Sequence, residues 1–144
     1  MKTFKNFEEI KQYYNENTNT YEFVENEQLL DVELNFNLSV DSNILAGNIN
    51  AGNINACNIN AENIDACNIN ACNIKAYDIK ACNIKAHDIN AFDINAFNID
   101  AYDIIFEAVC FASETFVCKS IKGKRVNNQY FCLDSDVVIK NENS

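Results

Sequence analysis

The sequence predicts an all-β solenoid of short, stacked parallel coils, and three observations lead to this prediction. Isoleucine recurs at every fifth position from Ile44 to Ile104. Alanine recurs at every fifth position from Ala46 to Ala101. A period of five fits neither the 3.6-residue repeat of a helix nor the two-residue repeat of a plain strand. Each pentad should therefore be a structural unit of its own, with successive coils stacked about 4.8 Å apart.

The pentad pattern also predicts which side chains face inward. Residues two apart on an extended segment share a face, so each isoleucine and the alanine two positions later can both point inside. The residue after alanine varies, and Glu62 or Phe92 would crowd or desolvate a narrow core. The Asn or Asp before isoleucine suits a corner, because these residues tolerate left-handed backbone angles and bond nearby backbone. The predicted core ladder is Ile49, Ile54, Ile59, Ile64, Ile69, Ile74, Ile79, Ile84, Ile89, Ile94 and Ile99.

In these residues the chain resembles the pentapeptide repeat family, whose units place Asn or Asp before a large apolar centre. The match covers about residues 43 to 104. The resemblance implies a right-handed quadrilateral β-helix with four pentads per coil, hence about three coils in this chain. The family's small residue lies two positions before the centre, whereas here that slot is variable and alanine follows the isoleucine. This departure leaves a second register open, in which the variable slot is buried.

A coil of four pentads would stack residues that lie 20 positions apart. The outward columns would then be Gly47, Cys67, His87; Gly52, Cys72, Phe92; Cys57, Tyr77, Phe97; and Glu62, Cys82, Tyr102. The last full coil would present a possible interaction rim of His87, Phe92, Phe97 and Tyr102. Such a belt suggests a contact with the chain's own C-terminal segment or with a second subunit. The alternative is a set of scattered exposed aromatic residues with no role.

The flanks predict caps at both ends, within one structural domain made of residues 1–42, 43–106 and 107–144. Apolar residues at helical spacing predict a short helix over residues 4–15, with Phe4, Phe7, Ile10 and Tyr14 on one face. Alternation predicts a strand over residues 32–40, with a shorter one at 21–24. Residues 107–144 are rich in β-branched and aromatic side chains and predict strands. A solenoid end exposes unpaired backbone, so we expect the C-terminal face to be sealed in a homodimer.

The sequence offers no recognisable catalytic, cofactor-binding or metal-binding constellation. His87 is the only histidine, and the seven cysteines form no Cys-x-x-Cys pair. In a coil of 20 residues, Cys57, Cys67, Cys72 and Cys82 would lie on four different faces, so that none would stack on another. Phosphate loops, nucleophile elbows and dinucleotide fingerprints are not found. We therefore expect a protein that is not an enzyme and uses no cofactor.

Composition narrows the remaining functions. The net charge of −10 opposes direct binding to nucleic acid, and no apolar run is long enough to cross a bilayer. The odd cysteine count favours reduced thiols in a cytoplasmic protein. We expect a structural or protein-interaction scaffold whose partner is unknown. The family resemblance implies an alternative, a DNA mimic that binds or modulates DNA gyrase or topoisomerase. A stack only about 15 Å tall and a positive band of Lys75, Lys80 and Lys85 argue against it.

Overall fold

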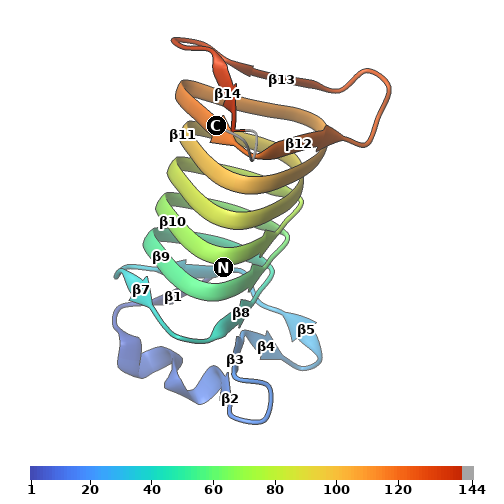
Figure 1. The fold of residues 1–144 in the computed structure, drawn as a ribbon. Coiled ribbons are helices and arrows are strands. Elements are labelled where there is room, and N and C mark those ends of the chain that lie inside the picture. The colour runs from blue at the N-terminus through green and yellow to red at the C-terminus, as the bar shows by residue number, and fades with distance from the viewer. Residues whose placement is uncertain (141–144) are drawn as a thin grey trace.

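The computed structural model describes residues 1–140. Strands β9 (Asn48–Asn60), β10 (Asn63–Lys75) and β11 (Asp78–Cys118) wind around a common axis in stacked turns (Figure 1). Neighbouring turns pair in parallel, and the whole stack has about six turns. The predicted β-solenoid of stacked coils is therefore confirmed.

The coil is shorter than predicted. Ile64 of β10 lies opposite Ile49 of β9 on one side and opposite Ile79 of β11 on the other. Paired residues are thus 15 positions apart, so each coil holds three pentads and the predicted quadrilateral coil of 20 residues is wrong. The number of coils is correspondingly larger than the predicted three. Each pentad specifies a corner, but identical pentads carry no information on how many corners close one turn.

Isoleucine and alanine fill the interior of the coil. Every isoleucine from Ile49 to Ile99 exposes at most 2% of its surface. The repeat alanines are also buried, apart from Ala76 and Ala81, which are partly buried. In the variable slot, Glu62 and His87 are exposed. The isoleucines therefore form three inward columns, because each stacks on the one 15 positions away.

A short 3₁₀ helix and the strands around it close the N-terminal end. The helix η1 (Phe7–Tyr13) starts at Asn6, whose side chain accepts a hydrogen bond from the Glu9 amide. The predicted helix over residues 4–15 is longer than the observed one, because Phe4 belongs to strand β1 (Lys2–Phe4) and pairs with Leu34. Tyr14 is exposed, and its neighbour Tyr13 is buried instead.

The segment between η1 and the repeats forms an irregular first coil. The strand predicted over residues 32–40 is divided into β6 (Val32–Leu34) and β7 (Leu38–Ser39), because the chain turns a corner between them. Both pair with β9, as does β8 (Asn43–Leu45). The remaining elements are β2 (Tyr14–Asn15) and β3 (Thr20–Glu22), which pair with each other, and the β4 (Val24–Glu25) and β5 (Gln28–Leu29) hairpin.

The C-terminal residues add one last coil of three separate strands. These are β12 (Ser120–Gly123), β13 (Gln129–Cys132) and β14 (Val137–Ile139). Each pairs in parallel with β11, and among residues 1–140 none has a strand on its other side (Figure 1). Phe106, Cys110 and Phe116 are fully buried near the end of β11, where the isoleucine pattern has stopped.

Candidate interaction surfaces

The 15-residue coil rearranges the outward columns. Backbone bonds show the order directly, because the Tyr77 amide donates to the Glu62 carbonyl and the Phe92 amide to the Tyr77 carbonyl (2.8 Å). The three corner columns are Gly47, Glu62, Tyr77, Phe92; Gly52, Cys67, Cys82, Phe97; and Cys57, Cys72, His87, Tyr102. The four columns expected from a 20-residue coil are therefore wrong.

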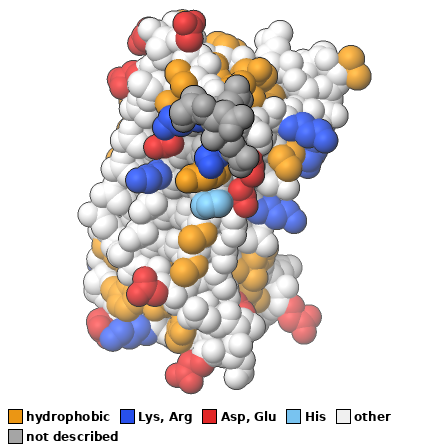
Figure 2. Space-filling view, viewed as in Figure 1, with side chains coloured by type: hydrophobic (Ala, Val, Ile, Leu, Met, Phe, Trp, Pro, Cys, Tyr) orange, Lys and Arg blue, Asp and Glu red, His pale blue; other side chains and the backbone are white. Residues whose placement is uncertain are grey.

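The residues of the expected rim do not form one belt around a single coil. His87 stacks on Tyr102 of the next coil, with ring centroids 4.4 Å apart and planes 3° from parallel. Phe92 stacks on Tyr77 of the previous coil at 4.7 Å and 11°. Phe97 is 54% exposed and is the last residue in the column of Gly52, Cys67 and Cys82. Figure 2 shows the single histidine within a row of hydrophobic side chains that runs along the solenoid axis.

Two cations from the C-terminal segment cover the ends of the aromatic stacks. The Arg125 guanidinium lies 4.6 Å from the centroid of the Phe92 ring, and the Lys119 ammonium lies 4.3 Å from that of Tyr102. Arg125 also approaches the Glu107 carboxylate at 3.6 Å, as Lys124 does at 3.5 Å. Lys119, Lys124 and Arg125 are thus engaged with the chain's own aromatic and acidic groups.

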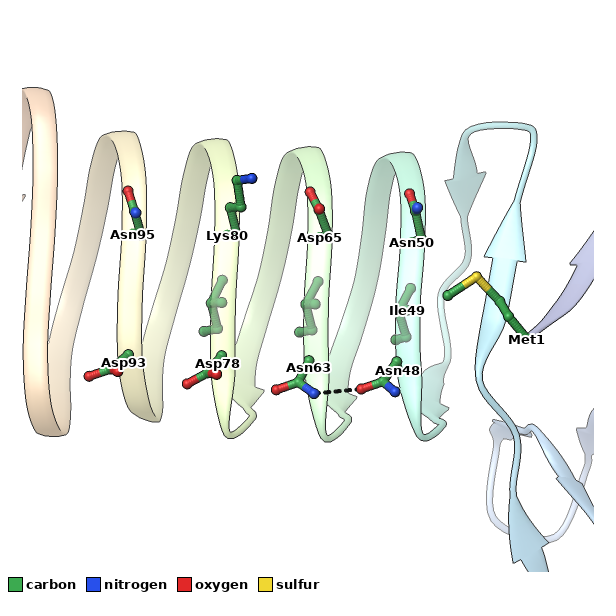
Figure 3. A pocket seen from close by; sticks show the side chains of 12 residues that line it. Met1, Asn48, Ile49, Asn50, Asn63, Asp65, Asp78, Lys80, Asp93 and Asn95 are labelled. Atoms are coloured by element: carbon green, nitrogen blue, oxygen red, sulfur yellow. Dashed lines mark hydrogen bonds between the residues drawn. The ribbon is translucent and has the colours of Figure 1, made fainter.

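One flat face of the solenoid carries a shallow polar groove (Figure 3). One edge is the ladder of Asn48, Asn63, Asp78 and Asp93, and the other is Asn50, Asp65, Lys80 and Asn95. The Asn63 amide donates to the Asn48 side-chain oxygen at 2.6 Å. Slight loss of hydration, together with the charge of Asp93, raises the pKa of the largely exposed Asp78. The groove can offer hydrogen bonds to a partner, although the Asn48 and Asn63 amides already bond each other along one edge.

The C-terminal end of the solenoid exposes apolar side chains. We name this surface the C-terminal apolar end and define it by five residues that each expose more than 40% of their surface: Tyr130, Phe131, Leu133, Val138 and Ile139. Phe131 contacts the Phe111 ring at a centroid distance of 4.9 Å. Tyr130 lies against the buried Phe106 ring at 6.2 Å. The sequence signal for this surface is the run Val137–Ile139, since three consecutive apolar residues of a strand cannot all face inward.

The described part of the chain lacks both a metal-ligand cluster and a membrane-spanning helix. Residues 1–140 contain no group of three or more His, Cys, Asp or Glu side chains placed to hold a metal ion. No helix within the same range is long and apolar enough to cross a membrane. Comparisons with protein-family models, curated proteins and solved structures found no match to this chain.

Proposed function

We propose that this protein is a non-enzymatic scaffold whose C-terminal apolar end pairs with the same end of a second copy. The observation that supports this most strongly is the exposure of that end. Tyr130, Phe131 and Val138 lie on strands whose outer edges have no partner within residues 1–140. An exposed apolar patch beside unpaired backbone groups is a ready site for association.

Charge favours pairing between like ends. Residues 105–144 carry five acidic and five basic residues, so this part is neutral overall. The remaining residues carry 16 acidic residues (21 − 5) against six basic ones (11 − 5), a net charge of −10. Two copies that meet at their neutral ends keep their acidic parts far apart. Lys119 and Arg125, held on the aromatic stacks, lie close to this end and add no net repulsion.

A twofold arrangement fits these edges. In an isologous dimer the same surface meets itself, and the strands β12, β13 and β14 of one copy would lie antiparallel to strands of the last coil of the other. The result would be one longer rod with a sealed N-terminal cap at each outer end. The flat faces would then present polar ladders from both copies to a further protein partner, whose identity is open.

The right-handed winding, the kinship with pentapeptide repeat proteins and a cytoplasmic location belong to the same proposal. Parallel strands of one sheet are joined by right-handed connections in nearly all known cases, which supports a right-handed coil. Consecutive Asx-Ile pentads support the kinship, in a variant with three pentads per coil. All seven cysteines are free thiols, which supports a reducing compartment.

The gyrase-directed DNA mimic remains the second candidate, and the observation that favours it is height. About six turns at about 4.8 Å each make a stack roughly 29 Å tall, twice that of the shorter solenoid expected from the sequence. Lys75, Lys80 and Lys85 oppose it, because they place one positive charge on each face of a single coil. A gyrase supercoiling assay tests this candidate, and no effect at micromolar protein would remove it.

The scaffold proposal is tested by multi-angle light scattering over a wide range of protein concentration. We expect the wild type to have the mass of a dimer and the Phe131→Ser/Val138→Ser variant to have that of a monomer. Tyr77→Ser is the matched control, since Tyr77 is 57% exposed but lies on the repeat coils. This control should remain dimeric. A wild type that stays monomeric throughout, or a control that dissociates equally, would refute the proposal.

A further inference from the structure

The 15-residue coil brings the four surface cysteines together in two stacked pairs, contrary to the expectation that none would stack. Cys67 lies beside Cys82, because their neighbours Ala66 and Asn68 pair with Ala81 and Asn83. Cys57 lies beside Cys72 in the same way, between the paired alanines 56 and 71 and the paired asparagines 58 and 73. Each pair occupies adjacent coils of one corner column.

We propose that each pair binds one soft, two-coordinate metal ion, for which copper(I) has the fitting chemistry. Adjacent coils are about 4.8 Å apart, so in-register thiols share roughly that separation. Zinc–sulfur bonds are about 2.3 Å long, and a linear thiolate–metal–thiolate unit with bonds of similar length spans about 4.6 Å. Soft thiolate ligands favour copper(I), zinc and iron–sulfur clusters, and of these we assign copper(I). Both thiols of each pair are free, with no disulfide between them.

The number of ligands in each pair distinguishes a copper(I) site from a zinc site. Each pair supplies two sulfur atoms, and residues 1–140 hold no cluster of three or more metal-ligating side chains. Structural zinc takes four ligands, so neither pair satisfies it. His87 follows Cys72 in its column, but its ring lies flat on Tyr102 and its Nδ1 is 3.7 Å from the Asp88 carboxylate. The histidine is therefore engaged with other groups.

The pair of Cys67 and Cys82 also lines a hollow in the surface. The hollow runs along the corner column, where Phe97 closes one end, and Asp65 and Lys80 lie on its edge. Binding releases one proton from each thiol to solvent and forms two sulfur–copper bonds, while the chelator that delivered the ion is set free. No electron is transferred, and the site gains one negative charge.

The other three cysteines do not form such pairs. Cys110 and Cys118 are buried, and burial raises the pKa of both thiols, which keeps them protonated. Cys132 is partly buried and lies 3.3 Å from the Ser135 hydroxyl. These three stay unchanged when surface thiols are replaced, so they cannot account for a difference in metal binding between variants.

Two double variants test the pairing, because both remove two surface thiols. In Cys67→Ser/Cys82→Ser the remaining Cys57 and Cys72 still stack. In Cys57→Ser/Cys67→Ser the remaining Cys72 and Cys82 lie in different columns. Anaerobic titration with copper(I) against a chromogenic chelator should give two tightly bound ions for the wild type, one for the first variant and none for the second. Equal binding by the two variants, or no binding by the wild type, would overturn the proposal.

A second measurement uses the unaltered protein and does not depend on how the variants fold. The wild type is alkylated with iodoacetamide, with and without two equivalents of copper(I), and the modified residues are found by mass spectrometry. Copper(I) should protect Cys57, Cys67, Cys72 and Cys82 from alkylation by at least about tenfold, while zinc should protect none of them. Unchanged alkylation of these four thiols in the presence of copper(I) would contradict the assignment.

Discussion

The two ends of this solenoid differ in how far the chain covers the last coil of the stack. At the N-terminal end, Ile10 and Phe23 are fully buried, and the ring of Phe23 packs 5.8 Å from Phe4 and 5.3 Å from Tyr13. At the C-terminal end, Phe131 and Val138 expose 44% and 48% of their surfaces. A repeat stack has no natural end, so each terminus must cover it or leave it to a partner. This chain buries an aromatic cluster at one end, where Met1 and Leu29 still remain exposed, and leaves the five side chains of the C-terminal apolar end exposed at the other.

The same contrast explains how the corner columns change along the chain. Gly47 and Gly52 are the first residues of two corner columns, at the place where the N-terminal cap packs against the first coils. A Cβ at Gly47 would lie 2.6 Å from an Asp31 side-chain oxygen, and one at Gly52 would lie 2.8 Å from that of Asn37. Farther along, the corners face solvent, so large side chains fit. The columns therefore run from glycine to aromatic residues because only their first coil is covered.

The largest expected effect comes from opening the sealed end. Phe23→Ala should lower the free energy of unfolding by about 3–5 kcal/mol, because it removes a fully buried ring. Phe131→Ala is the matched control at the other end and should cost the monomer less than about 1 kcal/mol. Urea denaturation at low protein concentration measures both. Similar losses for the two variants would show that the ends are closed to the same degree.

The next effect concerns the contact between the N-terminal cap and the first coil. Gly47→Ala should destabilise the protein by about 1–3 kcal/mol, since the new methyl group meets both Asp31 and the Leu30 backbone. Gly52→Ala meets only the Asn37 side chain, which can turn away, and should cost less. Thermal unfolding of the two variants measures which substitution costs more stability. A larger loss for Gly52→Ala would contradict this account of the cap.

A smaller effect tests the column order in the coils between the ends. Tyr77 and Phe92 stack face to face, so a double-mutant cycle with leucine at both positions should give a coupling of about 0.5–1.5 kcal/mol. Tyr77 and Phe97 are 20 positions apart and lie in different columns, so their cycle should give a value near zero. Coupling only in the second cycle would favour a coil of 20 residues.

The smallest effect is a pH dependence within the polar groove. Because slight loss of hydration raises the folded pKa of Asp78, its ionisation costs stability as the pH rises through and above its ordinary value of 3.8. Asp78→Asn should therefore raise the melting temperature slightly at pH 7 and leave it unchanged near pH 3, where the carboxyl is protonated. Melting curves at the two pH values measure this. A decrease at pH 7 would mean that the Asp78 charge is stabilising.

The sequence predicted the solenoid because its signal is local. Each pentad states which side chains are apolar and small enough to lie inside, and Ile64 and Ala66 are indeed buried. The number of pentads per turn depends on how the whole coil closes. Because the pentads are nearly identical, the local pattern around Ile64 does not say which other pentad it will pair with. The family resemblance supplied four pentads, whereas the backbone closes with three.

The candidate surfaces were harder to predict for the same reason. His87 and Tyr102, like Cys67 and Cys82, are 15 positions apart, so an assumed period of 20 separates residues that in fact stack. The exposure of Phe131 depends on whether another coil stacks on its strand, which no local pattern records. Lys119 and Arg125 can be read from the sequence, but their contacts with the aromatic stacks cannot.

Amide hydrogen exchange at two protein concentrations tests the difference between the ends most directly. If the C-terminal apolar end pairs two copies, the amides of β12, β13 and β14 should become more protected as the concentration rises. The amides of β1 and η1 should exchange at the same rate at both concentrations, because that end is sealed within each chain. Concentration-dependent protection at the N-terminal end, or at neither end, would contradict the account.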